Sequence, residues 1–333
     1  MRILMTGATG FIGGALARAL LAQGHELVCA VRNPARLDLG PGAWRALQAD
    51  LESVPAAAWW QPHLQGVDAV VNAVGILREG NGQSFEALHA RAPIELFMAA
   101  AAAGVKAVVQ VSALGADDEA QSRYHLSKKA ADDILRALPV AGAVVQPSAV
   151  YGPGGSSAMM FNTMALLPVL ALPGAGGMAM RPVHVDDVVA GILAVLAAPP
   201  RPVATIAFVG PKNLTLAEYL HELRGALGGR TWLPVVLSMP RAVFLYAARL
   251  AAFVPGSALD ADTAGMLLRG NTAPVEAFQR LLHRLPRPVS QFIPPGQAAA
   301  VRGQTLRGLA RLALRVALGV LAVAAIFAAA WFI

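Results

Sequence analysis

A glycine-rich turn in the first fourteen residues constrains this chain more than any other feature. Gly7, Gly10 and Gly13 follow a short apolar run, and residues 15–20 continue with helical spacing. Glycine lets a backbone turn tightly and approach a phosphate, and the free N–H groups of the next helix face the negative charge. The turn therefore predicts a seat for a pyrophosphate at the start of a helix.

Strand and helix patterns then alternate along the first half of the chain. Apolar runs at residues 25–31, 68–74 and 105–112, and a strand end near 49–51, are separated by helical stretches such as the alanine-rich 84–104. Parallel strands covered on both faces appear as such continuous runs. We therefore predict an α/β Rossmann fold, with a doubly wound parallel sheet in residues 1–150. A smaller substrate-side domain, partly interleaved with the first, is expected at 151–290.

Polar residues at the predicted strand ends suggest how a dinucleotide is held. Arg32 follows the second strand, where an arginine accommodates the 2′-phosphate of NADP and an acidic residue would favour NAD. Asp50 and Asn72 end the third and fourth strands and are placed to line the cofactor crevice. The sequence thus favours NADP(H) over NAD.

Three residues suggest catalytic chemistry. Ser112 ends the fifth predicted strand, and Tyr124 and Lys128 are four apart, so on a helix they share a face. A neighbouring ammonium is expected to lower the pKa of the phenol from about 10 and make it a proton donor and acceptor near neutrality. Ser112 is then expected to bond the substrate oxygen, while Lys128 also holds the ribose of the nicotinamide half.

Two features of the second half bear on substrate and structure. The apolar stretch with Met159, Met160, Phe161 and Leu166 favours a hydrophobic substrate, although core packing explains it equally well. His184 is expected to be structural, with Asp186 capping a helix at 188–197, and Thr215 with Glu218 forms a capping box for a helix at 216–227.

The C-terminal sequence predicts a membrane element. Four prolines in residues 286–295 indicate a linker, placed at 291–305, and an anchor helix is expected at 306–333. Arg307, Arg311 and Arg315 precede 18 residues without a charge, at 316–333, and a helix that spans a bilayer needs about 20 apolar residues. The arginines place the protein on the cytoplasmic face. An amphipathic helix in the membrane plane, or a partner for another membrane subunit, are the alternatives.

The composition of the chain restricts the classes of partner that the protein is expected to bind. The net charge of +7 is carried mostly by arginine, and no basic patch is interleaved with aromatic residues, so nucleic acid is not expected. Cys29 is the single cysteine, which excludes an internal disulfide and indicates a reducing compartment. No metal site is predicted.

The motifs together resemble the extended and atypical short-chain dehydrogenase/reductase superfamily. The resemblance rests on TGATGFIGG, on Ser112, Tyr124 and Lys128, on PSAVYGP at 147–153 and on RPVHVDDV at 181–188. VSALGAD at 111–117 and FVGP at 208–211 resemble the subgroup with the NADPH-binding accessory subunit of respiratory complex I. The resemblance implies an NADP(H) site that contains Gly7, Thr9, Gly10, Phe11, Ile12, Gly13, Arg32, Asp50, Leu51, Asn72, Ala73, Val74, Tyr124, Lys128 and Pro147.

Several functions remain open at this point. We expect a membrane-tethered NADP(H)-dependent oxidoreductase that acts on a lipophilic carbonyl or alcohol, with Tyr124 as proton donor or acceptor. An epimerase or dehydratase is a related alternative. A non-catalytic NADPH-binding subunit of a membrane complex, or a sensor of the nucleotide ratio, belongs to a different class.

Overall fold

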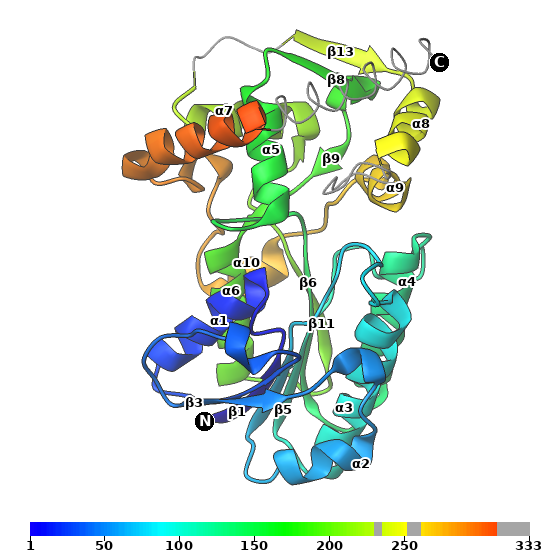
Figure 1. Cartoon of the computed structure of the whole chain (residues 1–333), viewed down its shortest axis with the longest axis vertical. Coiled ribbons are helices and arrows are strands. Elements are labelled where there is room, and N and C mark those ends of the chain that lie inside the picture. Colours follow the sequence, from blue (N-terminus) through cyan, green and yellow to red (C-terminus); the bar gives the residue numbers. More distant parts are fainter. Residues whose placement is uncertain (230–234, 252–260, 312–333) are drawn as a thin grey trace, which may run out of the picture.

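The chain forms two lobes, seen one above the other in Figure 1. The computed structural model describes residues 1–229, 235–251 and 261–311. We call the lower part, which contains the N-terminus, the sheet lobe, and the upper part the small lobe.

The sheet lobe is built on a seven-stranded sheet in the order β11-β6-β5-β4-β1-β2-β3. Every neighbouring pair in it is parallel, which confirms the predicted doubly wound sheet. Its strands are β1 (Arg2–Thr6), β2 (Glu26–Val31), β3 (Trp44–Gln48), β4 (Ala69–Asn72), β5 (Ala107–Val111), β6 (Ala141–Pro147) and β11 (Ala204–Phe208).

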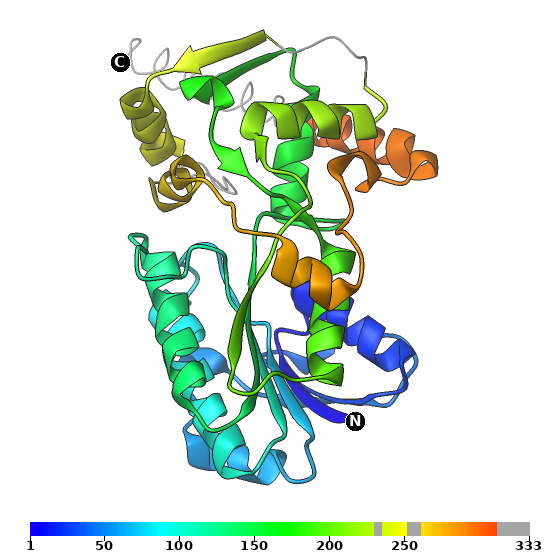
Figure 2. The same cartoon turned by 180° about the vertical axis from the view of Figure 1, so that it is seen from behind.

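Helices cover both faces of this sheet (Figures 1 and 2). One face packs against α1 (Phe11–Ala22), α6 (Val185–Ala197) and α10 (Glu276–Leu282), around a core that includes Leu16, Val188 and Phe278. The other face packs against α2 (Ala57–Trp60), α3 (Ala92–Ala102) and α4 (Arg123–Ala137). Because β11, α6 and α10 come from the second half of the chain, the polypeptide returns to the sheet lobe after its first visit to the small lobe.

The small lobe has its own core, in which Phe161, Leu172, Tyr219 and Phe292 are buried. Its helices are α5 (Ser156–Leu166), α7 (Leu216–Ala226), α8 (Arg241–Ala251) and α9 (Ala261–Arg269). Two-stranded sheets pair β8 (Val169–Pro173) with β13 (Val235–Met239), β9 (Ala179–Met180) with β12 (Leu214–Thr215), and β7 (Val150–Tyr151) with β10 (Val183–His184).

Two details differ from the sequence expectations, and a third agrees with them. The helix expected at 84–104 is split into a π-helix at Glu86–Arg91 and α3. Helix α6 is capped by His184, whose side chain accepts the Asp186 N–H, and so it begins at Val185 instead of after a cap by Asp186. The capping box of Thr215 and Glu218 at the start of α7 is confirmed.

The segment expected to be a linker is packed and partly helical. Val289, Phe292 and Ile293 are buried in the core of the small lobe, and residues 295–311 are helical. Its prolines end one helix and precede the next, and the apolar residues between them provide the burial that holds the segment in place.

Within the described residues, no helix has the length and apolar character needed to cross a membrane. The run at 316–333, on which the anchor was predicted, lies outside them.

Candidate active site

The glycine turn lies between β1 and α1 and makes close backbone contacts. Gly7 has a φ of +75°, and a Cβ added there would lie 2.5 Å from the carbonyl carbon of Ala73. At Gly13 an added Cβ would lie 2.1 Å from the Gly7 oxygen. Gly10 is the N-cap of α1 and offers no side-chain hydrogen bond, so the first amides of the helix, from Phe11 onward, have no side-chain cap. The turn thus has the form that a pyrophosphate requires.

A hollow of about 320 Å³ opens beside this turn. Thr9, Gly10 and Phe11 line one side, and the guanidinium-bearing Arg18 and Arg36 line it as well. Arg18, Arg32 and Arg36 are exposed, and none of them forms a hydrogen bond or ion pair through its side chain with another part of the described chain. Sequence reasoning found Arg32 from its position after β2. It missed Arg18, the one arginine of α1, and Arg36, whose available signal was its position four residues after Arg32.

The strand-end residues have distinct environments. Asp50 caps a short 3-10 helix by accepting the Glu52 N–H, and Leu51 is buried. The Asn72 side chain is buried and bonded within the sheet: its oxygen accepts from Thr6, and its nitrogen donates to Gln110 at 2.6 Å. Asn72 therefore orders the sheet edge.

Other predicted cofactor residues form the floor of the crevice. Ile12 lies in the first turn of α1, while the Ala73 backbone touches Gly7 and the Val74 carbonyl accepts a hydrogen bond from Lys128 at 2.8 Å. Pro147 is buried at the end of β6. The structure thus brings the glycine turn and the ends of β1, β4, β5 and β6 to one edge, with Arg32 and Asp50 toward β2 and β3.

Helix α4 carries Tyr124, Lys128 and Asp132 on its buried face. The Ser112 hydroxyl, at the end of β5, donates to Asp132 Oδ2 at 2.5 Å, and Lys128 Nζ donates to the Val111 carbonyl at 3.2 Å. The predicted serine, tyrosine and lysine therefore share one site, together with a carboxylate that the sequence analysis did not single out. Asp132 continues the four-residue spacing of Tyr124 and Lys128, which was the available signal.

Burial sets the protonation of this group and overturns one expectation. Burial, assisted by the charge of Asp132, raises the pKa of Tyr124 to about 12, whereas the sequence argument expected Lys128 to lower it. Burial also lowers the pKa of Lys128 to about 8, against the opposing effect of Asp132, and raises the pKa of Asp132 to about 6. The phenol therefore keeps its proton at neutral pH.

His89 packs edge-on against the Tyr124 ring, with centroids 5.3 Å apart. Its Nε2 accepts the Ile76 N–H at 3.0 Å, and its Nδ1 lies 3.0 Å from the hydroxyl of Ser127, which itself donates to the Tyr124 carbonyl. The proton of His89 is thus on Nδ1. Burial and the Lys128 charge lower its pKa to about 2, so His89 positions the tyrosine and does not exchange protons.

Gly75 keeps the approach to Lys128 open. A Cβ at this position would lie 3.2 Å from Lys128 Nζ and 3.7 Å from His89 Nε2. No sequence pattern singled out Gly75, because Lys128 and His89, which lie next to it in the structure, are far from it in the sequence.

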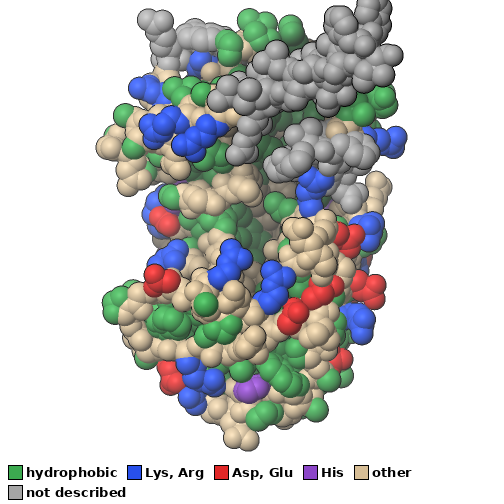
Figure 3. All heavy atoms as spheres, in the orientation of Figure 1, with side chains coloured by type: hydrophobic (Ala, Val, Ile, Leu, Met, Phe, Trp, Pro, Cys, Tyr) green, Lys and Arg blue, Asp and Glu red, His purple; other side chains and the backbone are tan. Residues whose placement is uncertain are grey.

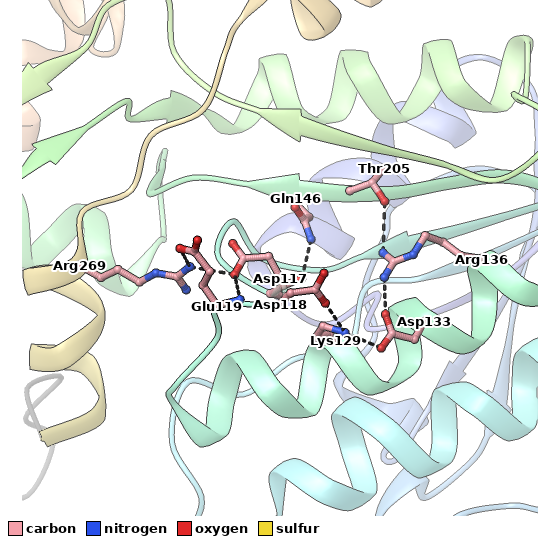
Figure 4. A network of polar contacts seen from close by, with 10 residues as sticks. Asp117, Asp118, Glu119, Lys129, Asp133, Arg136, Gln146, Thr205 and Arg269 are labelled. Atoms are coloured by element: carbon pink, nitrogen blue, oxygen red, sulfur yellow. Dashed lines mark hydrogen bonds and ion pairs between the residues drawn. The ribbon is translucent and has the colours of Figure 1, made fainter.

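The loop that follows Ser112 connects the two lobes (Figure 4). Arg269 of α9 donates to the Gly115 carbonyl at 3.1 Å and to Asp117 at 2.8 Å, and Gln146 donates to the Ala116 carbonyl. A small-lobe helix therefore holds the loop that follows Ser112.

The apolar residues proposed as pocket lining have another role. Phe161 is buried against Tyr219, and Met160 and Leu166 pack on the small-lobe core, while Met159 is exposed. Three of the four therefore belong to the core of the small lobe and carry no information about a substrate.

A parallel sheet with a glycine turn at its carboxyl edge, beside a buried tyrosine and lysine, defines an NAD(P)-binding Rossmann protein. Residues 7–155 match the protein family described as NAD(P)H-binding. A 3-diazoavenalumate denitrifying reductase from a Streptomyces species is 30% identical over 58% of this chain and 71% of its own length. The chain belongs to this family of NAD(P)-binding, epimerase-like Rossmann proteins.

Two further proteins show the range of relatives. The ceramide reductase of Caulobacter vibrioides is 29% identical over 72% of this chain and 73% of its own length. The NADPH-dependent quinone oxidoreductase QOR2 of Escherichia coli, solved with NADPH, has the same fold, with a TM-score of 0.66 and 21% identity over 87% of this chain and 97% of its own. Other solved structures with this fold, including epimerases, hold NAD.

Proposed function

We propose that this protein is an NADP(H)-dependent reductase of the short-chain type that converts the carbonyl group of a lipophilic substrate to an alcohol at a membrane surface. The observation that carries the proposal is the protonated Tyr124 phenol on α4, one helical turn from Lys128. Two relatives that are named reductases support the reaction class.

The residues present fit a nicotinamide dinucleotide. The first turn of α1 has no side-chain cap, and the close approach of Ala73 leaves no space for a side chain at Gly7, which is the form of a turn that binds phosphate. Arg18 and Arg36 line the hollow together with Asp38, and the exposed Arg32 follows β2, so arginines outnumber carboxylates at the expected adenosine side. Since a 2′-phosphate adds negative charge there, these arginines favour NADPH.

A bound reduced nicotinamide supplies the hydride for the substrate carbon. Tyr124 donates its phenolic proton to the substrate oxygen, and the Lys128 ammonium stabilises the phenolate that forms. Because Ser112 gives its own proton to Asp132, its oxygen accepts a hydrogen bond from the O–H of the alcohol product and does not donate to the substrate carbonyl, which leaves Tyr124 as the donor to that oxygen. An epimerase requires this tyrosine to remove a proton first, and a pKa of about 12 disfavours that step.

Support for a lipophilic substrate comes from two sources. The Caulobacter vibrioides relative is named for its action on ceramide. The uncharged run at 316–333, preceded by three arginines, suits attachment to the cytoplasmic face of a membrane.

Paired binding titrations with NADPH and NADH test the cofactor assignment. We expect tighter binding of NADPH, and we expect Arg32→Asp to reverse the preference. Arg91→Asp is the matched charge control, because Arg91 is exposed on the opposite face of the sheet. An Arg32→Asp protein with unchanged selectivity contradicts the assignment.

Turnover separates an enzyme from a non-catalytic subunit. NADPH oxidation is measured with a panel of long-chain ketones and quinones in detergent. Tyr124→Phe should reduce kcat at least about 100-fold, because a positioned general acid contributes that much, and should leave the Kd for NADPH unchanged. Tight NADPH binding without turnover of any carbonyl, together with copurification of a membrane complex, would instead identify an accessory subunit.

A further inference from the structure

The two-stranded sheet at the end of the small lobe exposes large apolar side chains. In the parallel pairing of β8 with β13, Val169 lies opposite Val235, and Leu237 lies opposite Ala171. The side chains of Val169, Val235 and Leu237 are 48%, 57% and 52% exposed. Leu170 and Leu172 alternate with the exposed positions and are buried in the core. One face of this pair is therefore covered by the lobe, while the other is apolar and uncovered.

Helix α8 continues this surface. Val243, Tyr246 and Leu250 follow one another at helical spacing on one side of the helix and are 51%, 63% and 53% exposed. Phe244 and Ala248 are buried on the other side. We call Val169, Val235, Leu237, Val243, Tyr246 and Leu250 the apolar end. Figure 1 places β8, β13 and α8 at the end of the molecule away from the sheet lobe.

The three elements that carry the apolar end, β8, β13 and α8, have no acidic residue, although Asp262 lies on the neighbouring α9. No Asp or Glu occurs between Glu222 and Asp260, whereas Arg241 and Arg249 lie on α8. After Glu276 the chain has seven arginines and no acidic residue. On the face shown in Figure 3, the upper part of the small lobe carries Lys and Arg side chains and no Asp or Glu.

The chain leaves the described residues from this lobe. Ala298 and Val301, in the helical residues 295–311, pack on the small-lobe core. The uncharged run begins at Val316, five residues after Arg311, and five extended residues span at most about 18 Å. If that run enters a bilayer, the small lobe stays close to the lipid headgroups.

We propose that the apolar end lies on an anionic lipid bilayer. Its aliphatic side chains enter the boundary between headgroups and acyl chains, Tyr246 lies at the interface that tyrosine prefers, and the arginines pair with lipid phosphates. The proposal rests on the proposed membrane attachment of residues 316–333 and adds an orientation to it. Continuity with that attachment, and the lack of carboxylates on β8, β13 and α8, favour lipid over a protein partner.

A fluorescent probe on the full-length chain tests the orientation. Cys29 is fully buried, so a nitrobenzoxadiazole maleimide labels an introduced Tyr246→Cys. Met98→Cys is the matched control, because Met98 is 49% exposed on α3 of the sheet lobe. Vesicles of phosphatidylglycerol and phosphatidylcholine, brominated near the carboxyl ends of their acyl chains, quench probes that enter this boundary.

The expected result is a shift to shorter wavelength and quenching at position 246, and neither at position 98. Vesicles of phosphatidylcholine alone should quench position 246 less, because the arginines then lack anionic partners. If the labelled chain floats with vesicles but position 246 responds like position 98, the orientation is wrong and the attachment stands. A chain that does not float refutes both, whatever its NADPH binding. A response at position 246 that requires added membrane protein shows a protein partner and overturns the proposal.

Discussion

At neutral pH the three buried ionisable groups of the site hold a defined set of protons. Tyr124 is a phenol, Lys128 has a pKa near 8 and Asp132 a pKa near 6. The carboxylate raises the pKa of Lys128, so the ammonium depends on Asp132 being ionised. The combination of an ionised Asp132 and a charged Lys128 exists between about pH 6 and about pH 8.

We therefore predict a bell-shaped dependence of kcat on pH for the wild-type protein. In Asp132→Asn the acid limb should disappear, because no carboxyl remains to be protonated near pH 6. The alkaline limb should move below pH 8, because Lys128 loses the charge that holds its pKa up. Initial rates of NADPH oxidation across the pH range measure both limbs. Asp133→Asn is the control, since Asp133 is next along the helix, half exposed and paired with Lys129 and Arg136. An unchanged alkaline limb in Asp132→Asn would contradict this coupling.

The same residues show what the sequence could and could not predict. Tyr124 and Lys128 were placed together correctly, because the spacing of a helix is local information. The contact between Ser112 and Asp132 joins residues 20 apart and depends on how α4 packs on the sheet. The pKa of Tyr124 was predicted in the wrong direction, because it depends on burial by Phe85, His89 and the rest of the site.

At the scale of elements, the junction between α9 and the loop after Ser112 couples the lobes. Arg269 binds the Gly115 carbonyl and Asp117, and lies 3.6 Å from Glu119. No pattern in the sequence linked residue 269 to the loop, because the pair is brought together only by the arrangement of the two lobes (Figure 4).

Removal of this arginine should release the loop without unfolding the protein. The protein should stay folded, because partly exposed ion pairs contribute only about 0.2–1 kcal/mol to stability. We predict that Arg269→Gln increases amide hydrogen exchange in residues 113–119 by several-fold. We also predict that it raises KM more than it lowers kcat. Exchange measured by mass spectrometry reports on the loop directly. Arg136→Gln provides the comparison, since Arg136 contacts Asp133 and Thr205 within the sheet lobe. Equal exchange in the two variants would show that the junction does not order the loop.

Helix ends were predicted with mixed success. The capping box of Thr215 and Glu218 was confirmed because it is a local pattern. The cap of α6 was assigned to Asp186, but the side chain of His184 takes that place, two residues earlier. Histidine is not among the usual capping residues, and only its buried position beside Phe292 fixes the ring there.

At the scale of the whole molecule, residues 284–293 fasten the lobes together. Asp187 on α6 is fully buried and accepts hydrogen bonds from the Arg284 side chain and the Arg287 N–H. A few residues later the chain reaches the small lobe, where the Phe292 ring stacks on Tyr151 with centroids 5.1 Å apart. The prolines in this segment suggested a linker. Its structural role comes from the apolar residues between them, which find a core that only the folded chain provides.

Loss of the Phe292 ring should therefore destabilise the small lobe. We predict that Phe292→Ala lowers its free energy of unfolding by about 3–5 kcal/mol, the usual cost of removing a buried phenylalanine. Leu285→Ala, at a 56% exposed side chain in the same segment, should change it by less than about 0.5 kcal/mol. Hydrogen exchange measured at increasing urea concentrations reports the unfolding of each lobe separately. Because the glycine turn and its crevice belong to the sheet lobe, NADPH protection of β1 and α1 should persist at urea concentrations that open the small lobe of Phe292→Ala. Simultaneous loss of both lobes would show that they unfold as one cooperative unit.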